Sequence, residues 1–229
     1  MIPRLRSLVC KDGPSAWKAA GFFVNSNNQI PLGAFNIQLQ SETQSGKTAA
    51  EGATSWLWSG IDATTSSISG VETSVLPERE ADEVETEEIV HPNGVTTVDH
   101  LVLRTSDVQR TKAAFEKIGV PLRRETDEIY PGLVQLFYRP ADEVIIEVIG
   151  AKDASDESSS AEFVCTLWGV TFNVNDDLST ASSLLKGRVS KVRKAKQKGR
   201  SIMTLRNSDN HPKLGLAVAL MTPHVRSSL

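Results

Sequence analysis

Two polar side chains in predicted β-strands, His100 and Glu147, are the residues of this 229-residue sequence best suited to chemistry. His100 lies in the run VDHLVL, where alternation puts it on one strand face with Val98 and Val102. An imidazole at such a position suits either a metal ligand or a general base. Glu147 interrupts the apolar run 144–149, where a carboxylate is rarely buried unless it is paired or binds a metal. Both are candidates for lining a pocket, with Glu147 as the candidate catalytic group.

Each of the two residues also has a structural interpretation. His100 is compatible with a core histidine whose ring is hydrogen-bonded, and Glu147 with a side chain at the wet edge of a sheet. Two ligands are fewer than zinc enzymes or non-haem iron sites use. Gln38 is a candidate third metal ligand, because residues 37–39 resemble residues 146–148. The remaining candidates, near the C-terminus, are Asp209, His211 and His224.

Residues 95–150 show the element order that would position this pair. After the strand run VDHLVL, Ser106 followed by Gln109 predicts a capping box at a helix start. Gly119 is placed to end that helix in a left-handed conformation. Three strand-like runs follow, PLRRETDEIY, GLVQLFYR and EVIIEVIG. The predicted order is β, α, β, β, β.

Residues 163–222 repeat this order. The run LWGVTFNV predicts a strand, Asp176 or Asp177 a helix cap, and Gly187 the end of that helix. Three further strands are predicted from RVSKVRKA, GRSIMTLR and LGLAVALM. Setting Asp107 on Asp177 gives an offset of 177 − 107 = 70 residues, so we expect an internal duplication of one supersecondary unit.

Residues 1–63 are interpreted as an N-terminal module, a degenerate third copy. AWKAAGF resembles AFEKIGV of the middle segment, and AFNIQL resembles EVIIEV. Residues 64–94 predict an acidic flexible linker, because the run from Glu78 to Glu88 has too little apolar surface to fold alone. The expected domains are this module, the linker and a paired-module domain over residues 95–222.

The phrase GVTTVDHLVLRTSD, with a glutamate in the last strand of the same unit, resembles the vicinal-oxygen-chelate superfamily of glyoxalases, bleomycin-resistance proteins and dioxygenases. WGVTFNVNDDL and GRSIMTLRNSD resemble the second module of uncharacterised glyoxalase-like members. The resemblance implies an α+β fold in which paired βαβββ modules curl a mixed sheet into a bowl. It also implies one divalent metal (Zn, Fe, Mn, Ni or Mg), held by side chains from the first and last strands of each module.

Carried over residue by residue, the resemblance places half of such a ligand set in this chain. His100 matches the first-strand histidine of the first module and Glu147 its last-strand carboxylate. Their counterparts in the second module are Val170 and Ala219, which cannot bind a metal. The principal hypothesis is therefore a protein that binds a small molecule in the bowl with an incomplete metal site.

Two other functions stay open. One is a metal-dependent lyase, isomerase or dioxygenase, in which the metal would polarise a carbonyl or enediolate oxygen. The other is a non-enzymatic interaction module. The resemblance is also compatible with a homodimer.

Composition limits the partners. A net charge of −3 predicts no bulk attraction to nucleic acid or to an anionic membrane. No apolar run approaches the roughly 20 residues that span a bilayer. Cys10 and Cys165 lie far apart and fit a reducing compartment, so a cytoplasmic location is expected, with organellar targeting left open. The basic run 188–200 has no interleaved aromatics, which favours a solvated sheet edge over a site for phosphate or RNA.

Overall fold

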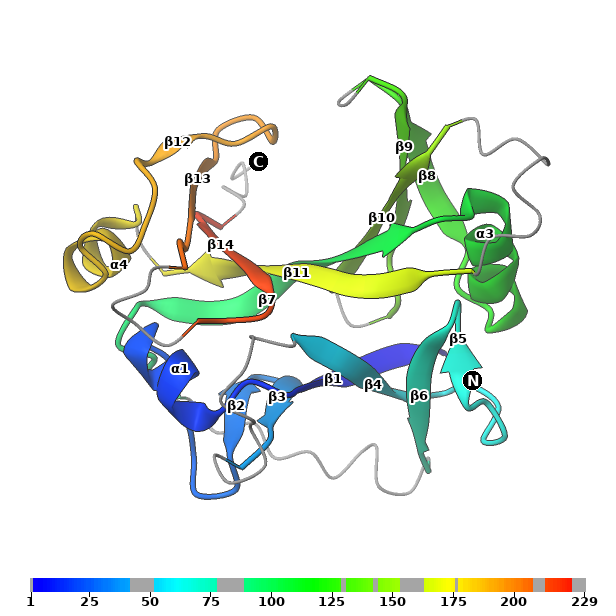
Figure 1. The fold of residues 1–229 in the computed structure, drawn as a ribbon, viewed down its shortest axis with the longest axis horizontal. Helices are drawn as coiled ribbons and strands as arrows, with labels where there is room; N and C mark the ends of the chain where they lie inside the picture. Colours follow the sequence, from blue (N-terminus) through cyan, green and yellow to red (C-terminus); the bar gives the residue numbers. More distant parts are fainter. Residues whose placement is uncertain are drawn as a thin grey trace, which may run out of the picture. The chain divides into compact units, whose positions relative to one another are not determined.

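The computed structural model describes residues 2–41, 52–77, 89–128, 131–141, 144–152, 163–175, 177–207 and 213–223. The chain is of mixed α+β class, with short helices and with strands in two sheets, as predicted (Figure 1). It divides into two compact units that each combine several segments of the sequence. Unit 1 comprises Met1–Val9, Thr54–Glu85 and His100–Trp168, and unit 2 comprises Cys10–Ala53, Thr86–Asp99 and Gly169–Leu229.

The first sheet is six-stranded, with the order β2-β3-β1-β4-β6-β5. Its strands, with the helix that follows β1, are β1 (Arg4–Cys10), α1 (Pro14–Ala19), β2 (Gln29–Leu32), β3 (Phe35–Leu39), β4 (Ala53–Ser59), β5 (Ser67–Ile68) and β6 (Val71–Leu76). The first four of these elements have the order β, α, β, β, one strand short of the βαβββ order, and the degenerate N-terminal module stays a prediction. The strands β4, β5 and β6 form a further abbreviated module, in which β4 and β6 are parallel. Residues 60–66, all described, contain no helix.

Part of the predicted linker is a strand. β5 and β6 lie within residues 64–94. Val71 and Thr73 are buried while Glu72 and Ser74 are exposed, which is the two-residue alternation of a half-buried strand. The acidic run on which the linker prediction rested, residues 78–88, lies outside the described residues. The prediction is therefore corrected for β5 and β6, and the other domain limits stay a prediction.

The second sheet is eight-stranded, with the order β12-β13-β14-β11-β7-β10-β9-β8. Its first module consists of β7 (Val95–Thr105), α3 (Val108–Lys117), β8 (Leu122–Thr126), β9 (Leu133–Tyr138) and β10 (Ile145–Ala151). Its second module consists of β11 (Cys165–Val174), α4 (Ser179–Leu184), β12 (Arg193–Lys194), β13 (Ser201–Thr204) and β14 (Ala217–Met221). The first strand is parallel to the last in each module, β7 with β10 and β11 with β14. The predicted paired βαβββ modules are confirmed.

The helix α3 is capped one residue later than the sequence suggested. The cap is Asp107, whose Oδ1 accepts a hydrogen bond from the Arg110 N–H at 2.9 Å. The predicted cap, Ser106, instead accepts a hydrogen bond from the Val164 N–H at 3.0 Å and so fixes the residue that precedes β11. Aspartate and serine cap equally well, so the pattern alone did not separate them. Gly119 follows the helix end with φ +77, as predicted.

The entry to α4 also differs from the prediction. Asp177 accepts a hydrogen bond from the Ser179 N–H at 3.0 Å, but the residue at the cap position is Leu178, in a left-handed conformation with φ 76. The Leu178 side chain is fully buried, and this burial offsets the cost of the strained backbone. Asp176, the other predicted cap, lies outside the described residues.

In unit 1 the core forms where α3 packs on one face of the sheet. Phe115 of α3 stacks on Tyr138 of β9, with ring centroids 4.2 Å apart. Tyr138 pairs with Ile146 of β10, which in turn pairs with Leu101 of β7, so these three share the covered face. Because successive strand residues point to opposite faces, Glu147 points to the other face of the same strands.

The core of unit 2 is aromatic. Trp17, Phe22 and Phe172 lie with their ring centroids 4.9 to 6.3 Å apart. Edge-to-face and tilted arrangements at these separations add to the stability from buried area. No helix in the described parts of the chain is long and apolar enough to cross a membrane.

Candidate functional site

His100 and Glu147 meet on the sheet face opposite to the one that packs against α3. His100 Nε2 lies 3.8 Å from Glu147 Oε2, and the two side chains are 13% and 14% exposed. The register places Ile145 opposite His100 and Val102 opposite Glu147, so the two polar side chains are diagonal neighbours. The structure thus brings together the two residues that the sequence singled out, and leaves both partly accessible to solvent.

Gln135 of β9 belongs to the same polar cluster. Its Nε2 donates a hydrogen bond to Glu147 Oε1. Because a carboxylate only accepts hydrogen bonds, the amide nitrogen must face it and the amide oxygen points elsewhere. Gln135 Oε1 is buried and accepts no hydrogen bond from the residues that the structure describes. Sequence reasoning missed Gln135, although a polar residue in the middle of the strand run GLVQLFYR was a visible signal.

Two arginines and two aromatic rings lie around the cluster. Arg104 pairs with Ile149 of β10, and its guanidinium lies 3.9 Å from the centroid of the Trp168 ring. Arg124 pairs with Phe137 of β9, with 5.8 Å between the guanidinium and the ring centroid. Stacking of this kind holds a guanidinium plane while its N–H edge stays available. The face therefore offers cationic donors and flat apolar surface beside the polar cluster.

The described residues do not complete a metal site. They contain no group of three or more His, Cys, Asp or Glu side chains that could hold an ion. Gln38, the predicted third ligand, lies in unit 2, where its Nε2 donates to the backbone carbonyls of Asn27, Asn28 and Leu39. The other candidates, Asp209, His211 and His224, lie outside the described residues. His100 and Glu147 alone fall short of the three protein ligands that catalytic zinc uses, so the metal set stays a prediction.

The second module contains no counterpart of the pair. Thr171 of β11 pairs with Ala219 of β14 as Val102 pairs with Glu147. This register sets Gly169, one residue before the predicted Val170, in the place of His100. A Cβ at Gly169 would lie 2.9 Å from the Ala217 carbonyl oxygen, so a side chain there is excluded by the neighbouring strand.

Unit 2 holds a different charged cluster, which contradicts the interpretation of the whole basic run 188–200 as solvated. Arg200 is 3% exposed, and its Nη2 donates to Asp99 Oδ2 at 2.7 Å and to Asn173 Oδ1 at 2.7 Å. Its Nε donates to the Thr222 carbonyl at 2.6 Å. Arg188 is 4% exposed and donates to the Ala19 carbonyl. The cations between them are exposed, as expected for a sheet edge.

A buried histidine in unit 2 is also closed to ligands. His91 is 2% exposed, and its Nδ1 accepts a hydrogen bond from the Phe23 N–H at 3.1 Å. An accepting Nδ1 fixes the neutral tautomer, so Nε2 donates to the Pro31 carbonyl at 2.8 Å. Burial lowers the pKa of His91, against a smaller opposing effect of the Pro31 hydrogen bond. The two ring nitrogens thus connect the segment at Phe23 to strand β2.

No protein-family model and no curated protein matches this chain. Among solved structures, a triple mutant of 4-hydroxymandelate synthase from Streptomyces coelicolor matches 100% of this chain and 95% of its own, with TM-score 0.62 and 10% identity. A xylose isomerase-like TIM barrel/4-hydroxyphenylpyruvate dioxygenase fusion protein matches 100% of this chain and 50% of its own, with TM-score 0.57 and 9% identity. Methylmalonyl-CoA epimerase from Mycobacterium tuberculosis matches 59% of this chain and 93% of its own, with TM-score 0.43 and 18% identity. The predicted glyoxalase-like, vicinal-oxygen-chelate fold is confirmed.

Proposed function

We propose that this glyoxalase-like protein binds a small polar molecule through His100, Glu147 and Gln135, without a resident metal. The observation that carries the proposal is the buried Gln135 Oε1, which accepts no hydrogen bond from the described residues while Nε2 is held by Glu147. A buried acceptor without a donor costs about 1–3 kcal/mol. A ligand hydroxyl that donates to Gln135 Oε1 removes this cost on binding.

The surrounding side chains support a ligand with a polar and a flat end. Arg104 and Arg124 favour negative charge or carbonyl oxygens on the ligand. Trp168 and Phe137 supply apolar surface. Glu147 and the neighbouring His100 can each accept a proton from a bound hydroxyl, and Glu147 is the catalytic candidate if the protein turns its ligand over. The small-molecule partner is thus proposed from the chemistry of one sheet face.

A second candidate function is a metal-dependent lyase, isomerase or dioxygenase. The separation of 3.8 Å between His100 Nε2 and Glu147 Oε2 favours it, because two such atoms can reach one ion. It requires at least one donor beyond the described pair. The homodimer and the cytoplasmic location stay predictions.

Elemental analysis of the purified protein, beside His100→Ala and Glu147→Ala, separates the two functions. We expect no stoichiometric divalent metal in any form. About one metal per chain in the native protein, lost in both variants, would establish the second function instead.

Ligand-observed NMR then tests binding directly. The probes are glycolate, pyruvate and catechol, which carry adjacent oxygens. We expect at least one probe to bind the native protein. Its binding should be lost in the Gln135→Leu variant. Gln197→Leu, an exposed glutamine of unit 2, is the matched control and should leave binding unchanged. Equal binding by Gln135→Leu and the native protein would contradict the proposal.

A further inference from the structure

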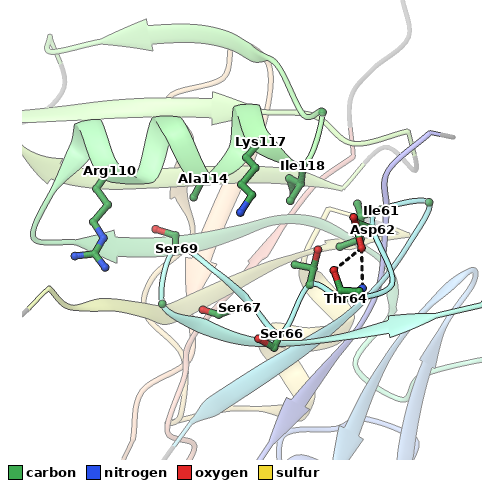
Figure 2. A pocket seen from close by; sticks show the side chains of 14 residues that line it. Ile61, Asp62, Thr64, Ser66, Ser67, Ser69, Arg110, Ala114, Lys117 and Ile118 are labelled. Atoms are coloured by element: carbon green, nitrogen blue, oxygen red, sulfur yellow. Dashed lines mark hydrogen bonds between the residues drawn. The ribbon is translucent and has the colours of Figure 1, made fainter.

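Unit 1 contains a pocket that shares no residue with the His100–Glu147 cluster. It has a volume of about 720 Å³ and lies between α3 and the segment 60–70 that connects β4 to β6 (Figure 2). A pocket of this size suits a small molecule, since ligand pockets are typically about 300–1,000 Å³. Because α3 packs on the opposite face of β9 and β10 from Glu147, the pocket and the cluster are separate sites.

The polar lining of the pocket results from a loop that stands where the module order would have a helix. In the βαβββ order a helix belongs after β4, but residues 60–66 form a loop that is rich in serine and threonine. Hydroxyl groups rather than an apolar helix stripe therefore face α3. The facing side of α3 carries Arg110, Ala114 and Lys117, which share one helix face because they are spaced by four and three residues. The pocket thus combines two cations with several hydroxyls.

Arg110 is held in place by an aromatic ring. Its guanidinium lies 4.1 Å from the centroid of Phe163. Phe163 in turn packs against Gly70, where an added Cβ would lie 3.1 Å from the ring and where φ is +81. Glycine at position 70 therefore allows the ring to lie where it supports Arg110. With one face on the ring, the guanidinium keeps its N–H edge for a ligand.

The loop is fastened to α3 by hydrogen bonds that leave two hydroxyls for a ligand. Ser69 Oγ and Thr111 Oγ1 lie 2.8 Å apart, and Thr111 Oγ1 lies 2.8 Å from Thr105 Oγ1. The Thr73 N–H donates to the Ser66 carbonyl at 2.9 Å. The side chains of Ser66 and Ser67 line the pocket and form no hydrogen bond with the described parts of the chain.

We propose that this pocket binds a small soluble phosphomonoester, with the phosphoryl group on Arg110 and Lys117 and on the hydroxyls of Ser66 and Ser67. A phosphoryl group carries up to two negative charges and three acceptor oxygens, which matches two cations and several donors better than a carboxylate does. The Ser/Thr loop and the volume leave room for a hydroxylated remainder.

The pocket also contains one carboxylate, that of Asp62, which opposes anion binding. Asp62 lines the pocket, and hydrogen bonds from the side chain and the N–H of Thr64 lower its pKa, with a smaller contribution from the charge of Lys117. Asp62 is thus ionised at neutral pH and offsets part of the positive charge of Lys117. Arg110 is therefore the main anion contact, and removal of the Asp62 charge should strengthen binding.

Isothermal titration calorimetry of the full chain with glycerol 3-phosphate and with inorganic phosphate tests these contributions to binding. We expect Arg110→Gln to weaken glycerol 3-phosphate binding by about tenfold or more, as for a lost charged hydrogen bond, and Lys117→Gln to weaken it less. Asp62→Asn should tighten binding, because the asparagine oxygen still accepts from Thr64 while the charge is gone. The control is Arg123→Gln, an exposed arginine of β8 outside the pocket, which should not change the affinity.

Several results would overturn the proposal. These are no binding of either phosphate probe, Arg110→Gln binding as tightly as the native protein, or Asp62→Asn binding more weakly. Acetate binding as tightly as phosphate would overturn the phosphoryl assignment. Binding to phosphatidate vesicles without binding to glycerol 3-phosphate would assign the site to a lipid headgroup instead of a soluble ligand.

Discussion

Adjacent residues of β7 belong to two very different acid–base pairs. Asp99, at the end of one segment of unit 2, pairs with Arg200 at 2.7 Å, and the two side chains are 7% and 1% exposed. His100, the first residue of the next segment of unit 1, lies 3.8 Å from Glu147, and these two side chains are 13% and 14% exposed. The guanidinium of Arg200 also donates to a backbone carbonyl and to an asparagine side chain. The Asp99–Arg200 pair is thus buried and hydrogen-bonded within unit 2, whereas the His100–Glu147 pair of unit 1 stays partly accessible to a ligand.

The same contrast separates the histidines. Both ring nitrogens of His91 in unit 2 form hydrogen bonds with backbone groups, those of Phe23 and of Pro31 in β2. His100 in unit 1 lies beside a carboxylate on a partly open sheet face. The two units therefore use their polar residues differently: unit 2 for cohesion of the fold and unit 1 for a site. This difference makes distinct predictions for stability and for binding.

The largest effect is expected from Arg200→Met. This change leaves the Asp99 carboxylate buried without its arginine, and breaking such a pair costs about 3–5 kcal/mol in free energy of unfolding. Urea unfolding followed by circular dichroism measures it. Lys198→Met, an exposed neighbour, is the control and should change stability little. A cost near zero for Arg200→Met would show that unit 2 does not depend on this cluster.

The next largest effect is a dependence of the free energy of unfolding on pH, caused by His91. Burial lowers its pKa below the ordinary 6.5 in the folded chain, so the unfolded chain takes up the proton first as the pH falls. The stabilisation is therefore fully present above pH 6.5 and is lost as the pH falls toward the lowered folded-state pKa. Urea unfolding at a series of pH values should show this decline in the native protein and in His100→Ala, and a shallower decline in His91→Gln. An unchanged decline in His91→Gln would assign it to other groups.

A smaller difference in stability is expected between substitutions at the starts of α3 and α4. Asp107 accepts a hydrogen bond from the third residue of α3, so Asp107→Ala should cost about 1 kcal/mol. Asp177 precedes the cap position of α4 and is fully exposed, so Asp177→Ala should cost less. Thermal unfolding of the two variants compares them. Equal losses would mean that Asp177 caps α4 as well as Asp107 caps α3.

The smallest change in stability is expected from Glu147→Gln. The glutamine oxygen can still accept from Gln135 Nε2, and the contact with His100 is long, at 3.8 Å, and partly exposed. The free energy of unfolding should change by about 1 kcal/mol or less. Binding of the probe found by ligand-observed NMR should be lost. A stability loss as large as that of Arg200→Met would place the His100–Glu147 pair among structural pairs.

The element order could be predicted because it depends on local patterns. Strand alternation, a cap residue and a helix-ending glycine each lie within a few residues, and their repetition at an offset of 70 residues predicts the two modules. The pair His100 and Glu147 could be found because a polar residue in an apolar strand stands out. Their proximity, however, depends on the β7–β10 register, which only the folded sheet fixes.

The remaining features depend on contacts that the sequence does not reveal. Gln135 matters because β9 places it beside Glu147. Arg200 looks like its basic neighbours, and its partner Asp99 lies 101 residues earlier. The pocket beside α3 exists because a loop replaces a helix after β4, and the sequence predicts a linker over residues 64–94. Short polar segments between apolar strands carry too little pattern to distinguish a linker from a loop packed on a helix.

The parallel pairing of first and last strands has a consequence for folding kinetics. His100 of β7 pairs with Ile145, and Gly169 of β11 pairs with Ala217, so each module closes only after the intervening helix and hairpin have been made. Such non-local pairing raises contact order and slows folding to roughly milliseconds or longer. On the ribosome, β11 must wait for β14 while β7 and β10 can already pair. The half of the chain with the accessible polar cluster is therefore assembled before the half with the buried arginine. Because β11 can already pair with β7, its other edge, which later pairs with β14, is the surface that a chaperone would meet first.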